Sequence, residues 1–485
     1  MTKELRRLST LVLIMFLALF GSTSVIQVVQ ADDLAANPLN RRTLYDSFDV
    51  QRGSIIASGS AIARSVKSND IYSWQREYTD PEMWAPVTGF INPVLQSSTG
   101  IEQAMNQELS GTGNSQFLAR VERIVSGQPP RGSNVLLSLD ASVQKVAYDA
   151  LGDLQGAVIA IEPKTGRVLA MVSSPSFDTN KLAAHDSDAV NKAHDALEDD
   201  PSNPLFNRAI GGNLNPPGST FKLVTASAAL ASGEYTPDST LPNVASYTLP
   251  GTSVPVYNDT RGTCGPGKKV SIATALRLSC NIPMAELAVE LGDDAIRAEA
   301  EKYGFNSSFS LPLKSTPSVY PDDLTPDRTA LSGYGQGDVR ATPLQMAMVT
   351  AGIANQGIVM NPRMVDEVVG PDLKVQKTFD DTQFGRALDE DLAKEMADMM
   401  VANVSEGIAT NARIDGVEVG GKTGTAQNGD EDPFTLWFTG FAPADDPQVA
   451  VAVVVENGGG QGQAGSGNTI AAPIAKKVME AVLGK

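Results

Sequence analysis

Strand-forming segments on both sides of a long helical stretch are the feature that most constrains how this chain folds. The apolar runs GAVIAIEP and RVLAMVSS are separated by a turn at Lys164-Thr165-Gly166. An apolar run, a polar turn with glycine and a second apolar run predict a β-hairpin, with Lys164 in solvent. Three more β-rich segments, GVEVGGKTGTAQ, TLWFTGFAPA and VAVAVVVENG, come much later. This order predicts one sheet built from both ends of a domain, with a helical insert between them.

The insert and its flanks carry apolar residues at helical spacing. The segments FKLVTASAALAS, SIATALRLS and IPMAELAVELG each predict a helix. TPLQMAMVTAGIANQG predicts another, with Thr342 before Pro343 at its start and Gly357 at its end. A strand over 135–139 and a helix precede the hairpin, and the helix AAPIAKKVMEAVLG closes the chain. The fold class is therefore α+β.

The length of the chain requires more than this one domain. Its 485 residues are too many for one compact core. Short strands between Gly/Ser turns follow the N-terminal segment, and SGQPPRGSN reads as a linker or turn cluster. We expect a cytoplasmic tip and membrane anchor at 1–31, a smaller β-rich non-catalytic domain, of pedestal or dimerisation type, at 32–134, and the main domain at 135–485.

The N-terminal segment predicts export across a membrane. Lys3, Arg6 and Arg7 precede an uncharged apolar run from Leu8 to Val29, and a basic flank before such a run is typical of exported chains. The run is long enough to span a bilayer. A small-residue pattern ending at Ala31 leaves cleavage open as the alternative. We favour an uncleaved single-pass anchor, with the bulk of the chain outside the cytoplasm.

Charge and histidine content exclude several classes of function. The formal net charge of −18 repels phosphate backbones, so no nucleic-acid partner is expected. The two histidines, His185 and His194, share one polar segment. With only these two histidines, we do not expect a Ser-His-Asp triad or a histidine-rich metal site. We therefore expect no metal and no cofactor, and any nucleophile must use a lysine or a carboxylate as its base.

A first candidate motif stands in NPPGSTFKLVTA. The prolines and glycine halt the preceding chain, so Ser219 begins a helix and Lys222 lies one turn further on the same face. A serine at a helix N-terminus is suited to nucleophilic attack, and a lysine with a lowered pKa can take its proton. The spacing alone is weak, because Ser142 and Lys145 share it at an ordinary helix start.

Two further motifs follow in the same domain. Ser279-Cys280-Asn281 stands between two predicted helices, where a hydroxyl and an amide can face one side of a turn. Lys422-Thr423-Gly424-Thr425 follows a double glycine on a predicted strand, where a ligand can approach closely and a carboxylate can bind. Each motif has a weak copy elsewhere, at Ser466-Gly467-Asn468 and at the hairpin turn with Lys164. Only the three main motifs form an ordered set at element boundaries.

This ordered set resembles the penicillin-recognising serine acyl-transferases. The motifs stand as STFK, SCN and KTGT, and further stretches such as NPLNRR, QRGSI, GIEQAMNQELSG, PPGSTFK, GYGQGDVRATPLQMA and WFTGFAP make the chain similar to the class B penicillin-binding proteins of actinobacterial type. The resemblance covers the chain from about Asn37 onward. It implies a transpeptidase domain with a mainly antiparallel sheet flanked by helices and a helical subdomain, as in β-lactamases. A β-rich N-terminal domain and a membrane anchor would precede it.

The resemblance also implies a reaction. It points to a peptidoglycan D,D-transpeptidase that cross-links stem peptides through a serine acyl-enzyme during growth and division, and that β-lactams inhibit. Ser219 would attack the carbonyl between two D-alanines, and Lys222 would act as its base. Ser279 would relay a proton to the departing D-alanine, and Asn281 would bind the donor and position Lys222.

The third motif would complete this site. Lys422, Thr423 and Thr425, on the strand that contains Gly424, would hold the terminal carboxylate of the donor. The backbone N–H groups of Ser219 and Thr425 would form the oxyanion hole, where amides at a helix start are suitable donors. The membrane, a glycosyltransferase and proteins of the division or elongation machinery would be its partners.

The two cysteines predict a disulfide. An even, small number of cysteines in an exported chain permits one bridge, and Cys264 lies sixteen positions before Cys280 of the second motif. Such a bridge would tie a loop to the rim of the active site. Two independent thiols are the alternative.

Other functions stay open on the sequence. A D,D-carboxypeptidase or a β-lactamase would use the same serine with water as the acceptor. A weakly catalytic scaffold of the division machinery, or a β-lactam sensor, would need the same fold. The long region before the main domain and the expected anchor favour the transpeptidase.

Overall fold

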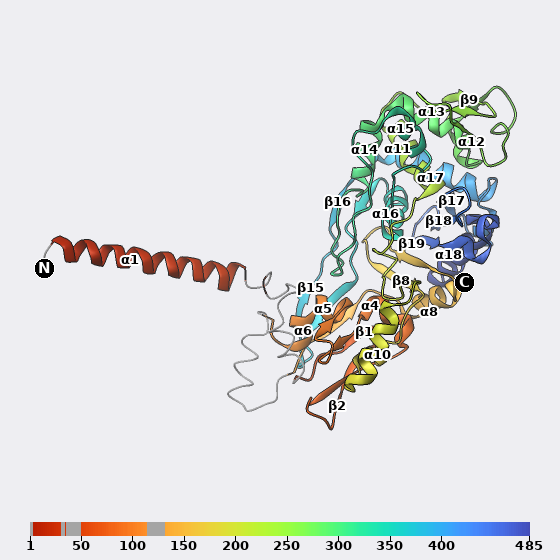
Figure 1. Ribbon diagram of the computed structural model, residues 1–485. Coiled ribbons are helices and arrows are strands. Elements are labelled where there is room, and N and C mark those ends of the chain that lie inside the picture. Colours follow the sequence, from red (N-terminus) through yellow and green to blue (C-terminus); the bar gives the residue numbers. More distant parts are fainter. Residues whose placement is uncertain (1–2, 31–33, 35–49, 114–130) are drawn as a thin grey trace.

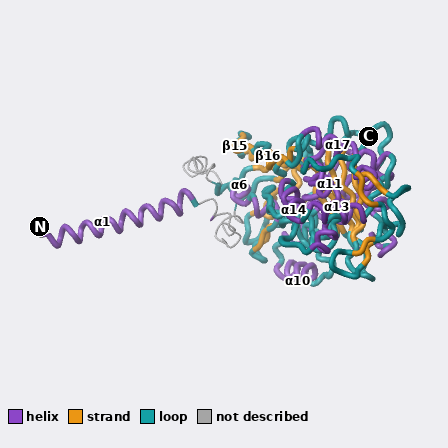
Figure 2. Tube along the Cα trace, turned by 90° about the horizontal axis from the view of Figure 1, so that it is seen from above, coloured by secondary structure: helices purple, strands orange, loops and turns teal. Residues whose placement is uncertain are grey.

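The computed structural model describes residues 3–30, 34, 50–113 and 131–485. One helix, α1, stands apart from an elongated body in which sheets and helices are packed together (Figure 1), and the view from above shows the same separation (Figure 2). Three features of the sequence lie outside the described residues: NPLNRR, most of SGQPPRGSN, and Ala31 of the possible cleavage site.

The central sheet takes its strands from both ends of the main domain, as predicted. It has five antiparallel strands in the order β17-β18-β19-β7-β8. The predicted hairpin is β7 with β8, and Gly166 in its turn has a φ of +76°. Lys164 is exposed there and pairs with Asp446, with 2.6 Å between Nζ and Oδ1. The strands are β7 (Gly156–Ile161), β8 (Val168–Ser174), β17 (Gly420–Ala426), β18 (Thr435–Ala442) and β19 (Val449–Val455).

Helices cover both faces of this sheet. On one face α8 (Ala141–Leu151) and α18 (Ala472–Val482) pack against each other and against the strands. On the other face lies α16 (Pro343–Ala354), whose predicted cap is present, since Thr342 Oγ1 accepts a hydrogen bond from the N–H of Gln345. Because α16 is buried almost all round, its residues are apolar on every side.

A helical lobe lies beside the edge strand β17. It contains the three helices predicted from apolar spacing, and α17 packs directly on β17. Its helices are α11 (Lys222–Ala231), α12 (Ile272–Arg277), α13 (Ile282–Leu291), α14 (Asp293–Lys302), α15 (Pro326–Ser332) and α17 (Glu390–Ser405). The small antiparallel pairs β9 (Thr240–Pro242) with β12 (Lys269–Ser271) and β10 (Tyr247–Thr248) with β11 (Pro255–Val256) belong to its loops.

A second sheet joins strands from residues 55–78 and 134–137 to strands from residues 365–378. Its order is β15-β14-β6-β1-β2-β3. The expected boundary between residues 134 and 135 falls inside β6, and the hairpin β14–β15 comes from far inside the expected main domain. The pairing of β14 with β6 decides this arrangement, and it has no local sequence signal. The strands are β1 (Ile55–Ala57), β2 (Ser60–Lys67), β3 (Trp74–Tyr78), β6 (Asn134–Leu137), β14 (Val365–Val369) and β15 (Val375–Thr378).

Short elements complete the body. The segment GIEQAMNQELSG forms two short helical turns, α5 (Gly100–Ala104) and α6 (Asn106–Ser110). The others are α4 (Pro81–Thr88), β4 (Ile91–Asn92), β5 (Ser97–Ser98), α9 (Thr179–Ala183), α10 (Ser187–Glu198), β13 (Ile358–Met360) and β16 (Gln383–Arg386).

The N-terminal helix has the length and composition of a membrane anchor. Helix α1 (Lys3–Ser24) continues into a π-helical turn, η1 (Val25–Val29). An 18-residue window within Lys3–Gln27 has a mean hydropathy of 2.1, and none of that window is buried against the rest of the protein. Among the described residues it is the one helix long and apolar enough to cross a membrane. Its exposed leucines, isoleucines and phenylalanines need an apolar medium.

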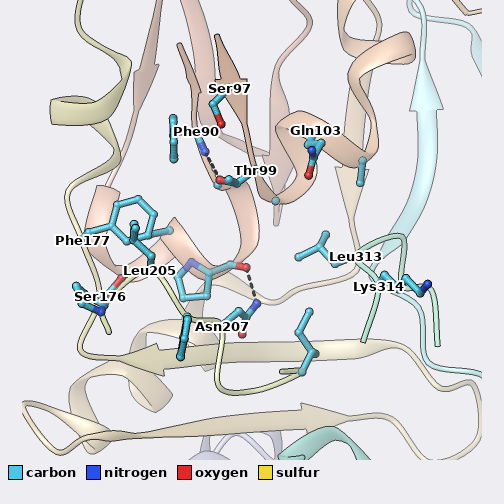
Figure 3. Close-up of a pocket in the computed structure, with 18 of the residues that line it drawn as sticks. Phe90, Ser97, Thr99, Gln103, Ser176, Phe177, Leu205, Asn207, Leu313 and Lys314 are labelled. Atoms are coloured by element: carbon cyan, nitrogen blue, oxygen red, sulfur yellow. Dashed lines mark hydrogen bonds between the residues drawn. The ribbon is translucent and has the colours of Figure 1, made fainter. Parts of the chain in front are cut away.

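A pocket of about 640 Å³ lies where the N-terminal region meets the main domain. Phe90, Thr99 and Gln103 line it from one side, and Leu205, Asn207, Leu313 and Lys314 from the others (Figure 3). Asn207 joins the two regions, since its Nδ2 donates to the carbonyl of Pro86 at 2.8 Å. The pocket contains none of the residues of the three sequence motifs.

Candidate active site

The turn that carries Ser219 is held in place by hydrogen bonds to its own backbone. Ser219 lies in a 3-10 turn, η3 (Gly218–Phe221), that runs directly into α11. The N–H of Gly218 donates to the carbonyl of Gly335 at 3.0 Å, and the indole of Trp437 donates to the carbonyl of Pro216 at 2.9 Å. A Cβ at Gly335, whose φ is +76°, would lie 2.0 Å from the carbonyl oxygen of Gly218. Only glycine fits there, which explains why Gly335 stands at the middle of GYGQG.

Lys222 is buried at the start of α11 and faces the second motif. Its Nζ donates to the Ser279 carbonyl at 2.7 Å, to the Ser279 hydroxyl at 3.3 Å and to Asn281 Oδ1 at 2.7 Å. Ser219 precedes it by one turn of helix, as predicted from the spacing. Burial lowers the pKa of Lys222 to about 7, against the opposing charge of Asp259. An amine with this pKa exists partly in the neutral form at neutral pH and can accept a proton.

The second motif forms the turn between α12 and α13. Ser279 has a φ of +56°, in the left-handed region that a non-glycine residue adopts at a cost of roughly 1 kcal/mol. This conformation presents both its carbonyl and its hydroxyl to the lysines. The hydroxyl accepts from Lys422 Nζ at 2.7 Å as well as from Lys222, so Ser279 lies between two amines.

The third motif lies on the edge strand β17. Lys422 is fully buried, and its Nζ donates to Ser279 Oγ and to the carbonyl of Thr423 at 3.0 Å. Burial, and secondly the charge of Lys222, lower the pKa of Lys422 well below its usual value, against the opposing charge of Asp259. A Cβ at Gly424 would lie 2.9 Å from the carbonyl oxygen of Pro217. The glycine therefore lets the strand approach the Ser219 turn.

The threonines of the third motif have other surroundings. Strand alternation places Thr423 and Thr425 on one face of β17 and Lys422 on the other. Thr425 Oγ1 accepts from the N–H of Gly467 at 3.3 Å. Among the described residues, neither threonine hydroxyl hydrogen-bonds to Lys222 or Lys422. Their assignment to a bound carboxylate stays a prediction.

The structure contains a disulfide between Cys264 and Cys280, with 5.7 Å between the Cα atoms. It ties a rim loop, residues 257–264, to the second motif. Asn258 strengthens the connection, because its Oδ1 accepts from the backbone N–H groups of Asn281 and Ile282 at 2.8 and 3.0 Å.

One charged group at the site has no counterpart in the sequence-based predictions. Asp259 lies in the rim loop, and its Oδ1 accepts from Asn281 Nδ2 at 3.1 Å. Its charge acts on Lys222, on Lys422 and on the buried phenol of Tyr334. The segment YNDTRGTC has no periodicity and contains no motif, so only its position before Cys264 hinted at a place on the rim.

The weak copies of the motifs have ordinary structural roles. Ser142 donates to Asp140 Oδ1 at 2.6 Å at the start of α8, and Lys145 pairs with Asp149 on the helix surface. Ser466 caps the short turn that follows it, accepting from the N–H of Thr469. Among the described residues, Ser142 and Lys145 make no hydrogen bond or ion pair to the three motifs, whereas the N–H of Gly467, in the other weak copy, donates to Thr425 Oγ1.

The histidines take no part in this site. His185 pairs with Asp70, with 2.5 Å between Nδ1 and Oδ2. His194 lies near Asp195 and Glu198 on α10, with possible ligand atoms within 4.8 Å of one another. The two carboxylates are exposed, where acidic side chains commonly gather without a metal.

Comparison with known proteins agrees with this geometry. Residues 156–480 match the penicillin binding protein transpeptidase domain, and residues 52–135 match the penicillin binding protein A dimerisation domain. The peptidoglycan D,D-transpeptidase PbpA of Mycolicibacterium smegmatis is 39% identical, with 100% of this chain and 99% of that protein covered, and the protein of the same name from Mycobacterium tuberculosis is also 39% identical with the same coverage.

Solved structures match over most of the chain. The ceftriaxone acyl-enzyme of penicillin-binding protein A from M. tuberculosis superposes with a TM-score of 0.86 at 38% identity, covering 91% of this chain and all of that one. Penicillin-binding protein 2 of Pseudomonas aeruginosa superposes with a TM-score of 0.75 at 31% identity, covering 90% and 96%. With a serine turn, two buried lysines and an SCN turn in one site, the chain belongs to the penicillin-binding protein transpeptidase family.

Proposed function

We propose that this chain is a peptidoglycan D,D-transpeptidase that works through an acyl-enzyme on Ser219. One observation carries the proposal: the SCN turn holds Lys222 and Lys422 together, within 3.3 Å and 2.7 Å of the Ser279 hydroxyl, one helical turn from Ser219. Two buried amines beside a serine provide the base and the positive charge that acyl transfer needs. The names of the relatives support the same reaction.

The first step forms the acyl-enzyme. Neutral Lys222 takes the proton of the Ser219 hydroxyl while Oγ attacks the carbonyl carbon between two D-alanines. In this proposal the N–H groups of Ser219 and Thr425 stabilise the negative charge on the carbonyl oxygen, and the packing of η3 against β17 supports this assignment. The C–N bond then breaks, and the amine of D-alanine leaves after gaining a proton.

Ser279 supplies the route for that proton. Its hydroxyl accepts from both amines, so it can pass a proton from Lys222 to the leaving nitrogen. Asn281 holds Lys222 in place through Oδ1. In the second step an amine of another stem peptide attacks the carbonyl carbon of the ester. The bond from that carbon to Ser219 Oγ breaks, and Ser279 and Lys222 pass the proton of the attacking amine to Oγ.

The terminal carboxylate of the donor explains the third motif. In this proposal the hydroxyls of Thr423 and Thr425 bind the carboxylate, and Lys422, on the other face of β17, provides positive charge. A carboxylate that arrives near Lys422 favours its protonated form and so opposes the effect of burial. Gly424 lets β17 lie close to the Ser219 turn, so that a donor bound along the strand can reach Ser219.

Location and partners belong to the same proposal. With α1 as an anchor and the basic Lys3, Arg6 and Arg7 in the cytoplasm, the body faces the peptidoglycan. A glycosyltransferase and proteins of the division or elongation machinery are the partners that such a position requires. β-Lactams compete for Ser219 as analogues of the donor.

The test uses a fluorescent penicillin on the whole protein. Wild-type protein should form a covalent adduct that survives denaturation, and Ser219→Ala should form none. Lys164→Ala changes the other KTG copy and should label like wild type. Equal labelling of Ser219→Ala and wild type would overturn the assignment of the nucleophile.

A second assay separates transfer from hydrolysis. A donor ending in D-alanyl-D-alanine is incubated with and without an amine-bearing acceptor stem. A cross-linked product supports the transpeptidase. Free D-alanine with no cross-link in the presence of acceptor supports the carboxypeptidase alternative.

A further inference from the structure

The amide of Asn281 is oriented by its partners on both sides. Its Oδ1 accepts from Lys222 Nζ at 2.7 Å. Its Nδ2 donates to the carbonyl of Tyr257 at 3.1 Å and to Asp259 Oδ1 at 3.1 Å. If the amide turned over, its NH₂ group would face the Lys222 amine, and its oxygen would face two acceptors. The rim loop therefore determines which end of Asn281 reaches the base.

The rim loop is attached firmly enough for this role. Asn258 is buried and accepts from two backbone N–H groups at the start of α13, while its Nδ2 donates to the carbonyl of Gly262 at 2.9 Å. The disulfide from Cys264 to Cys280 fixes the end of the loop one residue from Asn281. Asp259 follows Asn258 directly, so its carboxylate is held beside the amide.

Asp259 also balances charge at the site. Two buried amines lie 2.7 and 3.3 Å from the same hydroxyl, and each repels the positive charge of the other. The carboxylate of Asp259 acts on both and opposes the effect of burial on both. Its charge also acts on the buried phenol of Tyr334, which follows α15.

We propose that Asp259 is a positioning residue for the Ser219 reaction, which orients Asn281 toward Lys222 and places one negative charge beside the Lys222–Lys422 pair. The inference rests on the proposed function, because it assigns Asp259 a role in the same acylation step. Asp259 touches the reacting lysine only through Asn281.

Other charged groups around α11 are engaged elsewhere. Glu290 of α13 accepts from the hydroxyl of Tyr235, and Glu299 of α14 pairs with Lys302. Arg277 of α12 pairs with Glu406 after α17, and Glu286 of α13 faces Glu290 and Tyr247. The charges that act on Lys222 and Lys422 are therefore those of the two lysines and of Asp259.

The test measures the rate of acylation by a chromogenic cephalosporin across pH for Asp259→Asn, Asp259→Glu and Asp259→Ala. Asp259→Asn keeps an acceptor for Asn281 but removes the charge, so the rise of the rate with pH should shift to lower pH. Asp259→Glu keeps the charge, and its profile should keep the wild-type midpoint. Asp259→Ala removes both functions, so the shift should come with a plateau rate about tenfold lower.

Controls separate this role from a structural one and from the proposed function. Asp238→Asn makes the same change at an exposed aspartate that does not contact Asn281 and should leave the profile unchanged. Profiles that superimpose on wild type for Asp259→Asn, or a uniform loss without a shift, would overturn the inference. Ser219→Ala is measured in the same series, so a failure of Ser219 as nucleophile would be seen separately, as acylation of that variant.

Discussion

In the proposed reaction, Lys222 must be neutral before it can accept the proton of Ser219. Its ammonium would have three acceptors in the Ser279 carbonyl, the Ser279 hydroxyl and Asn281, so hydrogen bonding favours the charged form while burial favours the neutral one. Burial prevails and lowers the pKa of Lys222 to about 7. The amine of Lys222 is therefore neutral for part of the time and held in one position.

This pKa predicts the pH dependence of acylation. Protonated Lys222 cannot accept the Ser219 proton, so the second-order acylation rate should fall about tenfold per pH unit below pH 7. Above pH 7 the rate should level off. Stopped-flow measurement with a chromogenic cephalosporin between pH 5 and 9 provides the check.

Two variants serve as controls for that measurement, one expected to be inactive and one expected to behave like wild type. Lys222→Arg places a guanidinium that stays charged at every pH, and it should abolish acylation throughout the range. Lys164→Ala should follow the wild-type profile. A wild-type rate that does not change between pH 5 and 7 would contradict Lys222 as the base.

At the scale of elements, the rim loop and the α12–α13 turn form one unit through Cys264 and Cys280. The bridge closes a loop with a sequence separation of 16. Closing a loop of this length is worth about 3 kcal/mol in the chain-entropy account. Since Cys280 lies between Ser279 and Asn281, the same bridge restricts the turn that holds both lysines.

Removing the disulfide should therefore affect stability and activity together. The double variant Cys264→Ser/Cys280→Ser should melt several degrees below wild type and acylate more slowly at all pH values. Differential scanning fluorimetry and penicillin labelling measure the two effects. Two titratable thiols in unreduced, unfolded wild-type protein would show that the bridge is not formed.

Local patterns of the sequence predicted the elements that have a strong periodicity or a cap. The hairpin β7–β8, the helix α16 with its Thr342 cap and the helices α11 to α13 agree with the structure. The positions of Ser219, Lys222, Ser279, Asn281 and Lys422 in one site followed from their order along a domain and from resemblance to a family. Asp259 could not be found this way, because its role depends on a loop that meets Asn281 in space.

For the whole molecule, the prediction was weakest where distant segments pair. The sequence predicted β6 as a strand, but β14 reads VDEVV, which does not alternate apolar and polar residues. Their pairing joins Val368 to Val135, far apart in the sequence. The division at residue 134/135 therefore separates strands that hydrogen-bond to each other in the structure.

This shared sheet predicts that the main domain depends on the region before it. A fragment that begins at Ser138 would lack β1 to β3 and β6, so β14 would lose the partner that covers one of its edges. Val365 and Val368 are both buried in the whole protein, and their exposure in the fragment would cost about 1.5–3 kcal/mol of stability each. The hairpin β14–β15 should then open far more often than in the intact chain, because an isolated two-stranded hairpin is only marginally stable.

Hydrogen exchange distinguishes this local loss from general unfolding. Backbone amides of Val365–Val369 should exchange at least tenfold faster in the fragment than in a chain of residues 50–485, since each 1.4 kcal/mol of opening free energy corresponds to a factor of ten. Amides of β19, at the centre of the other sheet, should keep their protection and serve as the internal control. Equal protection of β14 in both chains would mean that β6 contributes nothing to its stability.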